Sequence, residues 1–307
     1  MYNIQTNTSI QDIRLHKKIS QKKLCNGLCS IAQLSRYESG QRFPKKIMFD
    51  TLIERLGESS KYFNYVSDFL DYQQCQYREK LIYYSMSHNN AKVDYYIDKY
   101  KSSSDKLDSL DNQFLSMILI SKIDSPEEKI KKYTDTIKMT IPEFDISNIS
   151  NYLLSHTEIS LINAIACCYK KNNQLDIALN IFNSLAFYID RNISSAYEKS
   201  RNQTLILANL TNLLLLNKQY IDVLYWSNKG IDICKEINDS YFLPVLYHAK
   251  CKALINIGSI DEAKKLAVYT YYLFKVNGQT NLAELILKDL KQSSNISFKI
   301  ELVNTTI

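Results

Sequence analysis

The chain has 307 residues, 45% of them apolar, so it is too long for one compact helical core and fits a small domain followed by a larger one or by a repeat array. Its six glycines and four prolines favour long helices with few tight turns. The net charge of +6 lies almost entirely in residues 1–60, which carry ten basic and five acidic side chains. Such a segment suits a polyanion-binding surface, and chance clustering on a solvated face explains the charge alone equally well.

Several kinds of protein are not expected. The N-terminus lacks the apolar stretch of a signal peptide, and the most apolar run, residues 205–216, is too short to cross a membrane, so we expect a cytoplasmic protein with no membrane partner. The seven cysteines form no C-x2-C pair, which favours reduced, mostly buried thiols over a redox switch and predicts neither a metal site nor a cofactor. The four histidines lie far apart, and no phosphate-binding loop or nucleophile motif is present, so we expect no enzyme.

The first 60 residues predict four short helices, over residues 10–18, 21–26, 31–39 and 45–56. Capping boxes, in which two polar side chains satisfy free amides at a helix start, are predicted at Ser9–Asp12 and Ser30–Gln33. Gly27 ends the second helix and begins a tight turn, and Gly40 suits the left-handed exit from the third. Two short helices joined by such a turn are typical of a DNA-binding helix-turn-helix unit.

The motif residues resemble the Cro/CI-type (XRE) helix-turn-helix family over roughly residues 9–57. They are Ile19-Ser20-Gln21-Lys22-Lys23-Leu24 and Leu34-Ser35-Arg36-Tyr37-Glu38-Ser39-Gly40-Gln41-Arg42-Phe43-Pro44. The turn Gly27–Ser30 is one residue shorter than the common form and resembles the subgroup found in the peptide-sensing Rgg/PlcR-like regulators of Gram-positive bacteria. The resemblance implies a structural ion pair between Arg14 and Glu38.

We expect the third helix to lie in the DNA major groove with its first two turns against base edges. Gln33 can pair with adenine and Arg36 with guanine, while Ile31 or Ala32 can contact a thymine methyl group. Gln21, at the start of the second helix, suits a phosphate. The expected DNA-binding residues are Gln21, Ser30, Ile31, Ala32, Gln33, Arg36, Arg42, Lys45 and Lys46, of which the last three are phosphate contacts. The alternative for this surface is an ordinary solvated helix face.

Beyond residue 62, apolar side chains recur at helical spacing and form a degenerate tetratricopeptide-like repeat of helix pairs. The residues expected to pack at the start of each second helix are Ala91, Lys129, Ala178, Val223 and Ala263, at steps of 38, 49, 45 and 40 residues. The segment Ile141–Asp145 interrupts the array after its second unit, and a helix over residues 283–290 closes it. Stacked pairs form a superhelix with a concave face, and an irregular helical bundle without a groove is the alternative.

The predicted fold is therefore all-α. It comprises a λ-repressor-like helix-turn-helix domain over residues 1–62, a tetratricopeptide-like superhelix for sensing and dimerisation over residues 63–295, and a tail over residues 296–307. Within the tail, Phe298 to Val303 alternate like a strand. This arrangement resembles the Rgg/PlcR-like regulators over nearly the whole chain. The resemblance implies a homodimer that binds double-stranded DNA and a short peptide that changes its DNA affinity. A helical-repeat scaffold, or an antitoxin-like partner whose helix-turn-helix makes protein contacts, is the alternative.

The first helix of each pair lines the concave face of a tetratricopeptide stack, so we expect the peptide to bind there. The expected peptide-binding residues are Asn163, Lys170, Asn212, Leu215, His248, Lys252 and Asn256. Asparagine side chains can both donate to and accept from a peptide backbone, and Lys170 or Lys252 can hold a peptide carboxylate. The alternative is that AT-rich coding places asparagine on any solvated helix.

Overall fold

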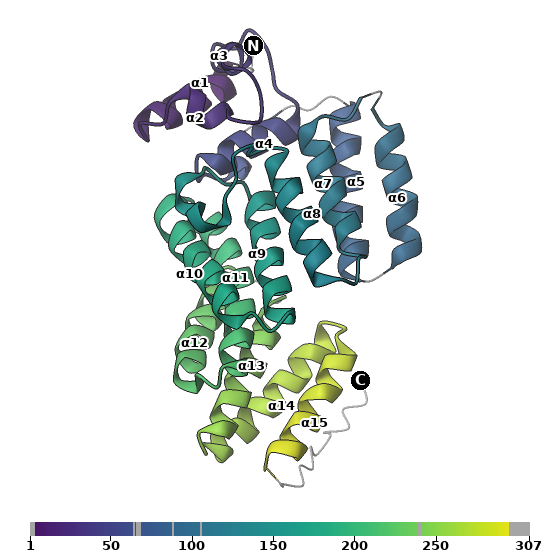
Figure 1. Cartoon of the computed structure of the whole chain (residues 1–307), viewed down its shortest axis with the longest axis vertical. Coiled ribbons are helices and arrows are strands. Elements are labelled where there is room, and N and C mark those ends of the chain that lie inside the picture. The colour runs from purple at the N-terminus through teal and green to yellow at the C-terminus, as the bar shows by residue number, and fades with distance from the viewer. Residues whose placement is uncertain are drawn as a thin grey trace. The chain divides into compact units, whose positions relative to one another are not determined.

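The computed structural model describes residues 4–63, 65, 69–87, 89–104, 106–238 and 241–294, and every regular element in these ranges is a helix (Figure 1). The predicted all-α fold is therefore confirmed for this part of the chain. Its contacts divide the chain into two compact units, residues 1–199 and 200–307. The first unit contains both the helix-turn-helix region and the first helix pairs, and the domain boundary expected after residue 62 stays a prediction. The tail over residues 296–307, with its predicted strand, lies outside the described residues.

The N-terminal region of the first unit is a cluster of short helices around one apolar core. The helices are α1 (Ile4–His16), α2 (Gln21–Cys25), α3 (Ile31–Glu38) and α4 (Lys46–Arg55). Ile10, Leu24, Leu34 and Leu52 have no exposed surface in this core. The prediction that Ser9 caps the first helix is wrong, because residues 4–8 are already helical and Ser9 lies within α1. The other three helices lie within one residue of their expected bounds.

Local sequence explains how α2 and α3 begin and end. The Ser20 side chain caps α2 by accepting a hydrogen bond from the Lys23 amide at 3.1 Å. Gly27 and Gly40 have φ angles of +70° and +74°, a conformation that glycine adopts without the steric cost other residues meet. The short turn and the exit from α3 therefore form as the sequence predicts.

Helix pairs fill the rest of the first unit. Among the described residues these are α5 (Phe69–Met86) with α6 (Asn90–Ser102), α7 (Ser109–Ile120) with α8 (Pro126–Lys138), and α9 (His156–Lys171) with α10 (Leu175–Asn192). The 3-10 turns η1 (Ser60–Tyr62) and η2 (Ile146–Asn151) precede α5 and α9. The turn η2 begins directly after the interruption predicted at Ile141–Asp145, and α5 to α8 lie side by side (Figure 1).

The second unit continues the same pattern. The helix α11 (Ala196–Leu216) starts in the first unit, and α12 (Tyr220–Glu236), α13 (Leu243–Asn256), α14 (Ile260–Val276) and α15 (Thr280–Ser294) follow. Each of α12, α13 and α14 packs against the helix that follows it. A Cβ atom at Gly230 would lie 2.9 Å from Leu246 Cδ1, so the absence of a side chain lets α12 and α13 approach closely.

The residues expected to pack at the start of each second helix are only partly right. Ala178, Val223 and Ala263 have no exposed surface, as expected. Ala91 is exposed, and Val93, two residues later, is the buried residue of α6. The error has a geometric cause: Val93, Ile97 and Tyr100 follow the spacing of one helix face, and Ala91 lies outside it.

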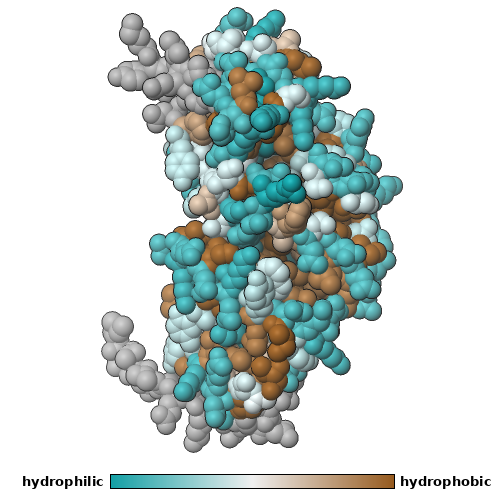
Figure 2. Space-filling model, turned by 90° about the vertical axis from the view of Figure 1, so that its left-hand side faces the viewer, coloured by the Kyte–Doolittle hydropathy of each residue, from teal (hydrophilic) through white to brown (hydrophobic). Residues whose placement is uncertain are grey.

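The surface mixes residue types. On the face drawn in Figure 2, hydrophobic residues form small areas between hydrophilic ones. Exposed hydrophobic residues include Phe69 on α5, Ile221 on α12 and Val276 at the end of α14. None of the helices in the described part of the chain is both long and apolar enough to cross a membrane.

Candidate nucleic-acid interface

The helix α3 has one buried face and one exposed face. Leu34 is fully buried and Tyr37 is 6% exposed, so these two side chains anchor the helix in the core. On the other face Ile31 is 48% exposed, and Ala32 and Arg36 are exposed as well. An exposed face with apolar and guanidinium groups near the helix start suits the edges of bases in a major groove.

A buried ion pair fixes the orientation of α3. The Arg14 guanidinium of α1 donates from Nε to Glu38 Oε1 at 2.6 Å and from Nη2 to Oε2 at 2.8 Å. Its Nη1 donates to the Ile19 carbonyl at 3.0 Å. The hydrogen bond with Glu38 raises the pKa of Arg14, so the guanidinium stays charged. The pair expected between Arg14 and Glu38 is therefore present and ties the end of α3 to α1.

Three residues expected at DNA, Gln21, Ser30 and Gln33, have other partners in this structure. Gln21 Nε2 donates to Glu38 Oε2 at 2.7 Å, which turns this amide toward the ion pair and away from a phosphate. Gln33 closes the predicted capping box. Its backbone amide donates to Ser30 Oγ, and its side-chain Oε1 accepts from the backbone amide of Ser30, both at 3.1 Å. Because Oε1 is used, bidentate pairing of Gln33 with adenine would require the cap to open.

The expected phosphate contacts are not equivalent. Arg42 and Lys45 are exposed at the connection between α3 and α4. Lys46 is only partly exposed, and its ammonium pairs with Asp50 one turn later in α4. Its backbone amide donates to Asp71 Oδ2 of α5 at 3.1 Å. Arg42 and Lys45 are therefore better placed than Lys46 to contact a DNA backbone.

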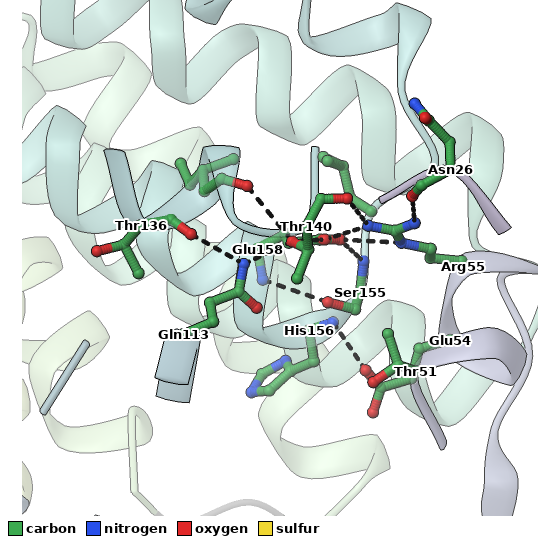
Figure 3. Close-up of polar contacts among 12 residues, drawn as sticks. Asn26, Thr51, Glu54, Arg55, Gln113, Thr136, Thr140, Ser155, His156 and Glu158 are labelled. Carbon is green, nitrogen blue, oxygen red and sulfur yellow. Dashed lines mark hydrogen bonds and ion pairs between the residues drawn. The ribbon is translucent and has the colours of Figure 1, made fainter. Parts of the chain in front are cut away.

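Sequence reasoning missed a buried polar network that joins the helix-turn-helix to the repeats (Figure 3). Arg55, at the end of α4, donates from Nη2 to Glu158 Oε1 of α9 at 2.5 Å and to the Thr140 carbonyl at 2.9 Å. Its Nη1 donates to the Asn26 carbonyl at 2.8 Å, next to the turn that precedes α3. The side chains of Arg55 and Glu158 are 2% and 0% exposed. One guanidinium therefore links the motif turn, α4 and α9.

Further hydrogen bonds satisfy the Glu158 carboxylate. The Thr140 hydroxyl donates to Oε1 at 2.6 Å and accepts from Gln113 Nε2 at 2.6 Å, and the Ser155 amide donates to Oε2 at 2.7 Å (Figure 3). Burial raises the pKa of Glu158, but the charge and hydrogen bonds of Arg55 and the other donors lower it more, so the net shift is downward. Glu158 is therefore held as a carboxylate.

Close backbone approach accompanies this network. A Cβ atom at Gly27 would lie 2.1 Å from the Thr140 carbonyl oxygen, and one at Gly57 would lie 2.1 Å from the Asn192 carbonyl oxygen. The Gly57 carbonyl accepts hydrogen bonds from the amides of Ser194 and Ser195 at 2.8 and 3.0 Å. Both glycines have positive φ angles, so any other residue there would be strained as well as too large. The helix-turn-helix is thus seated directly on the repeat helices.

The expected peptide-binding residues fall in both units. In the first unit, Asn163 and Lys170 lie two turns apart on α9, and Asn163 is only 8% exposed, which leaves little of it for a ligand. In the second unit, Asn212 Nδ2 donates to the Ala208 carbonyl at 2.9 Å, and Asn256 Nδ2 donates to the Lys252 carbonyl at 2.8 Å. Each of these two amides keeps one N–H and its carbonyl oxygen for a ligand.

The remaining members of the set lie on the same two helices of the second unit. Leu215 of α11 is partly exposed. On α13 the His248 ring packs edge-on against Phe274, with the ring centroids 6.3 Å apart, and Lys252 is partly exposed. A common peptide groove stays a prediction.

The architecture defines a class: a head of four short helices followed by tetratricopeptide-like helix pairs. No protein-family model matches the sequence, and no curated protein matches it in sequence. Among solved structures, PlcR of Bacillus thuringiensis, in complex with the peptide PapR7 and DNA and also in its apo form, matches with a TM-score of 0.56 at 18% identity. The match covers 92% of this chain and 98% of PlcR.

A second solved structure has the same architecture. The competence regulator ComR of Streptococcus vestibularis, in complex with its cognate signalling peptide XIP, matches with a TM-score of 0.54 at 15% identity. This match covers 95% of this chain and 99% of ComR. The resemblance to Rgg/PlcR-like regulators that the motif residues indicated is therefore confirmed for the fold.

Proposed function

We propose that this chain is a cytoplasmic, sequence-specific DNA-binding transcription regulator whose repeat region binds a short signalling peptide that changes its DNA affinity. The observation that carries the proposal is the exposed face of α3. Ile31, Ala32 and Arg36 project from a helix whose far side is held by the core and by the pair of Arg14 with Glu38. A recognition helix held in this way can enter a major groove without refolding.

The individual contacts follow from the exposed groups. Arg36 forms no ion pair within the described residues, so its guanidinium can pair bidentately with guanine. Ile31 and Ala32 suit thymine methyl groups, while Arg42 and Lys45 suit phosphates on either side of the groove. Ser30 and Gln33 serve first as the cap of α3, and a base contact from Gln33 would use its remaining N–H groups.

The sensing role rests on the fold. PlcR and ComR share this architecture over more than 90% of the chain, and their structures contain the peptide PapR7 and the cognate signalling peptide XIP, respectively. In this chain, partly exposed polar groups on first helices are proposed to meet the peptide: Lys170 on α9, Asn212 on α11, and His248 and Lys252 on α13. We expect a homodimer, because helix-turn-helix proteins of this kind read two half-sites about one DNA turn apart.

The test is binding of the full chain to a labelled duplex from upstream of its own gene, compared with a duplex of the same composition in scrambled order. Arg36→Ala is expected to cost about 1–3 kcal/mol for the specific duplex and to relax the preference at one base position. Lys131→Ala, which removes an exposed lysine on α8, is the matched control and keeps the wild-type affinity. A scaffold or an antitoxin-like partner would bind both duplexes equally, with no effect of Arg36→Ala.

A further inference from the structure

An exposed lysine outside the helix-turn-helix, Lys106, lies on the connection between α6 and α7, a segment that also carries Asp105 and Asp108 in the sequence. A cavity of about 460 Å³ is lined by Lys45 at the start of α4, by Ser102 at the end of α6, by Ser103, Ser104 and Lys106 of this connection, and by Leu70, Asp71 and Gln74 of α5. Figure 1 shows the connection at the end of α5 to α8 that is next to α4. A lysine that follows the first helix pair therefore lines the same cavity as Lys45, which is proposed to contact a DNA phosphate.

The charge at this cavity favours an anion. Lys45 and Lys106 are exposed, and neither forms an ion pair within the described residues. The acidic residue that lines the cavity, Asp71, uses its Oδ2 to accept hydrogen bonds from the Lys46 amide at 3.1 Å and from the Tyr65 hydroxyl at 3.2 Å. The ammonium groups of Lys45 and Lys106 are thus available beside the Asp71 carboxylate, which already accepts hydrogen bonds from the Lys46 amide and the Tyr65 hydroxyl.

The serines hold the connection in shape and are not themselves donors for a ligand. Ser103 Oγ donates to the Tyr100 carbonyl at 2.7 Å, and Ser104 Oγ donates to the Lys106 carbonyl at 3.0 Å. Because these hydroxyl protons are used within the turn, the ammonium groups are the charged donors at the cavity. Ser104 fixes the backbone of Lys106, so the position of this lysine is set by the turn.

We infer that Lys106 is a DNA-backbone contact supplied by the repeat region, which extends the phosphate contacts of the helix-turn-helix beyond Lys45. The inference rests on the proposed function and names a further part of its DNA interface. Phosphate contacts carry no sequence information and fix the position of a protein on the duplex. Lys106 would therefore set where the first helix pair lies along the DNA and leave base preference unchanged.

The experiment measures the affinity of the full chain for the upstream duplex and for the scrambled duplex by fluorescence anisotropy over a range of salt concentrations. Each phosphate contact contributes about 0.9 to the slope of log K against log salt. Lys106→Ala is expected to lower the magnitude of this slope by about 0.9 on both duplexes. The loss of DNA affinity between roughly 50 and 200 mM salt is then about 3.5-fold smaller than for the wild type. Lys106→Arg is expected to keep the wild-type slope.

Lys101→Ala is the matched control, because Lys101 is exposed near the same connection but does not line the cavity. A wild-type slope for Lys106→Ala, or an equal loss for Lys101→Ala, overturns the contact. A third result is that the wild type binds inorganic phosphate saturably and that Lys106→Ala abolishes this binding while the salt slope on DNA stays unchanged. That result assigns the cavity to a small phosphorylated ligand and overturns the DNA contact. Failure of the proposed function is separate, because it appears as equal affinity of the wild type for the two duplexes.

Discussion

Replacing Glu158 by alanine removes the carboxylate that receives hydrogen bonds from Arg55, Thr140 and the Ser155 amide. The Arg55 and Glu158 side chains are 2% and 0% exposed, so water does not replace the lost partner. Arg55 would keep only neutral acceptors, the carbonyls of Asn26 and Thr140. Breaking a buried ion pair from one side costs about 3–5 kcal/mol, because a buried charge is left without compensation. We expect Glu158→Ala to lower the free energy of unfolding by about this amount.

The assay is urea denaturation followed by far-ultraviolet circular dichroism. Glu128→Ala is the control, since Glu128 forms a half-exposed pair with Lys132 at 2.9 Å on α8, and surface pairs of this kind contribute about 0–1 kcal/mol. The double variant Arg55→Met/Glu158→Leu removes both charges and is expected to recover much of the lost stability. A Glu158→Ala protein within about 1 kcal/mol of the wild type would refute the reasoning.

Three further results are expected. Arg14→Ala leaves Glu38 buried without its cation, and thermal melting should show a loss of several kcal/mol; an unchanged melting temperature would contradict the role of the pair. The pKa of Glu158 is lowered in the folded state, so its charge stabilises the fold fully above its ordinary pKa of 4.5, and this contribution is lost as the pH falls below that value. The difference in unfolding free energy between wild type and Glu158→Gln should therefore narrow below pH 4.5. A difference that does not change with pH would argue against a stabilising carboxylate. Burial raises the pKa of Cys29 to about 11, so its alkylation by iodoacetamide at pH 8, identified by comparison with Cys29→Ser, should be slower than that of free cysteine.

The parts of the structure that were predictable depend on short-range patterns. The turn at Gly27 and the cap of α3 by Ser30 and Gln33 involve neighbours within four residues, whose chemistry alone fixes the local geometry. The pair of Arg14 with Glu38 spans 24 residues and was predictable only through the motif that it shares with a known family.

The long-range contacts had no such signal. Arg55 and Glu158 are 103 residues apart, and nothing local distinguishes Arg55 from the other basic residues of the N-terminal region. Ser155 and Glu158 form a capping box with a recognisable sequence pattern, and this pattern predicts the start of α9. The pattern does not indicate which residue pairs with the Glu158 carboxylate. The exposure of Ala91 was missed because a shift of two residues moves a side chain to another helix face.

A peptide bound to the repeats is proposed to change the affinity of the helix-turn-helix for DNA. The most direct measurement is an anisotropy titration of the upstream duplex with the full chain, with and without saturating synthetic peptides encoded by a short open reading frame beside its gene. Coupling of this kind is commonly worth about 5- to 150-fold in affinity. We expect one such peptide to change the dissociation constant within that range, and Asn212→Ala to raise the peptide concentration required. An unchanged dissociation constant at saturation with every peptide would contradict the account.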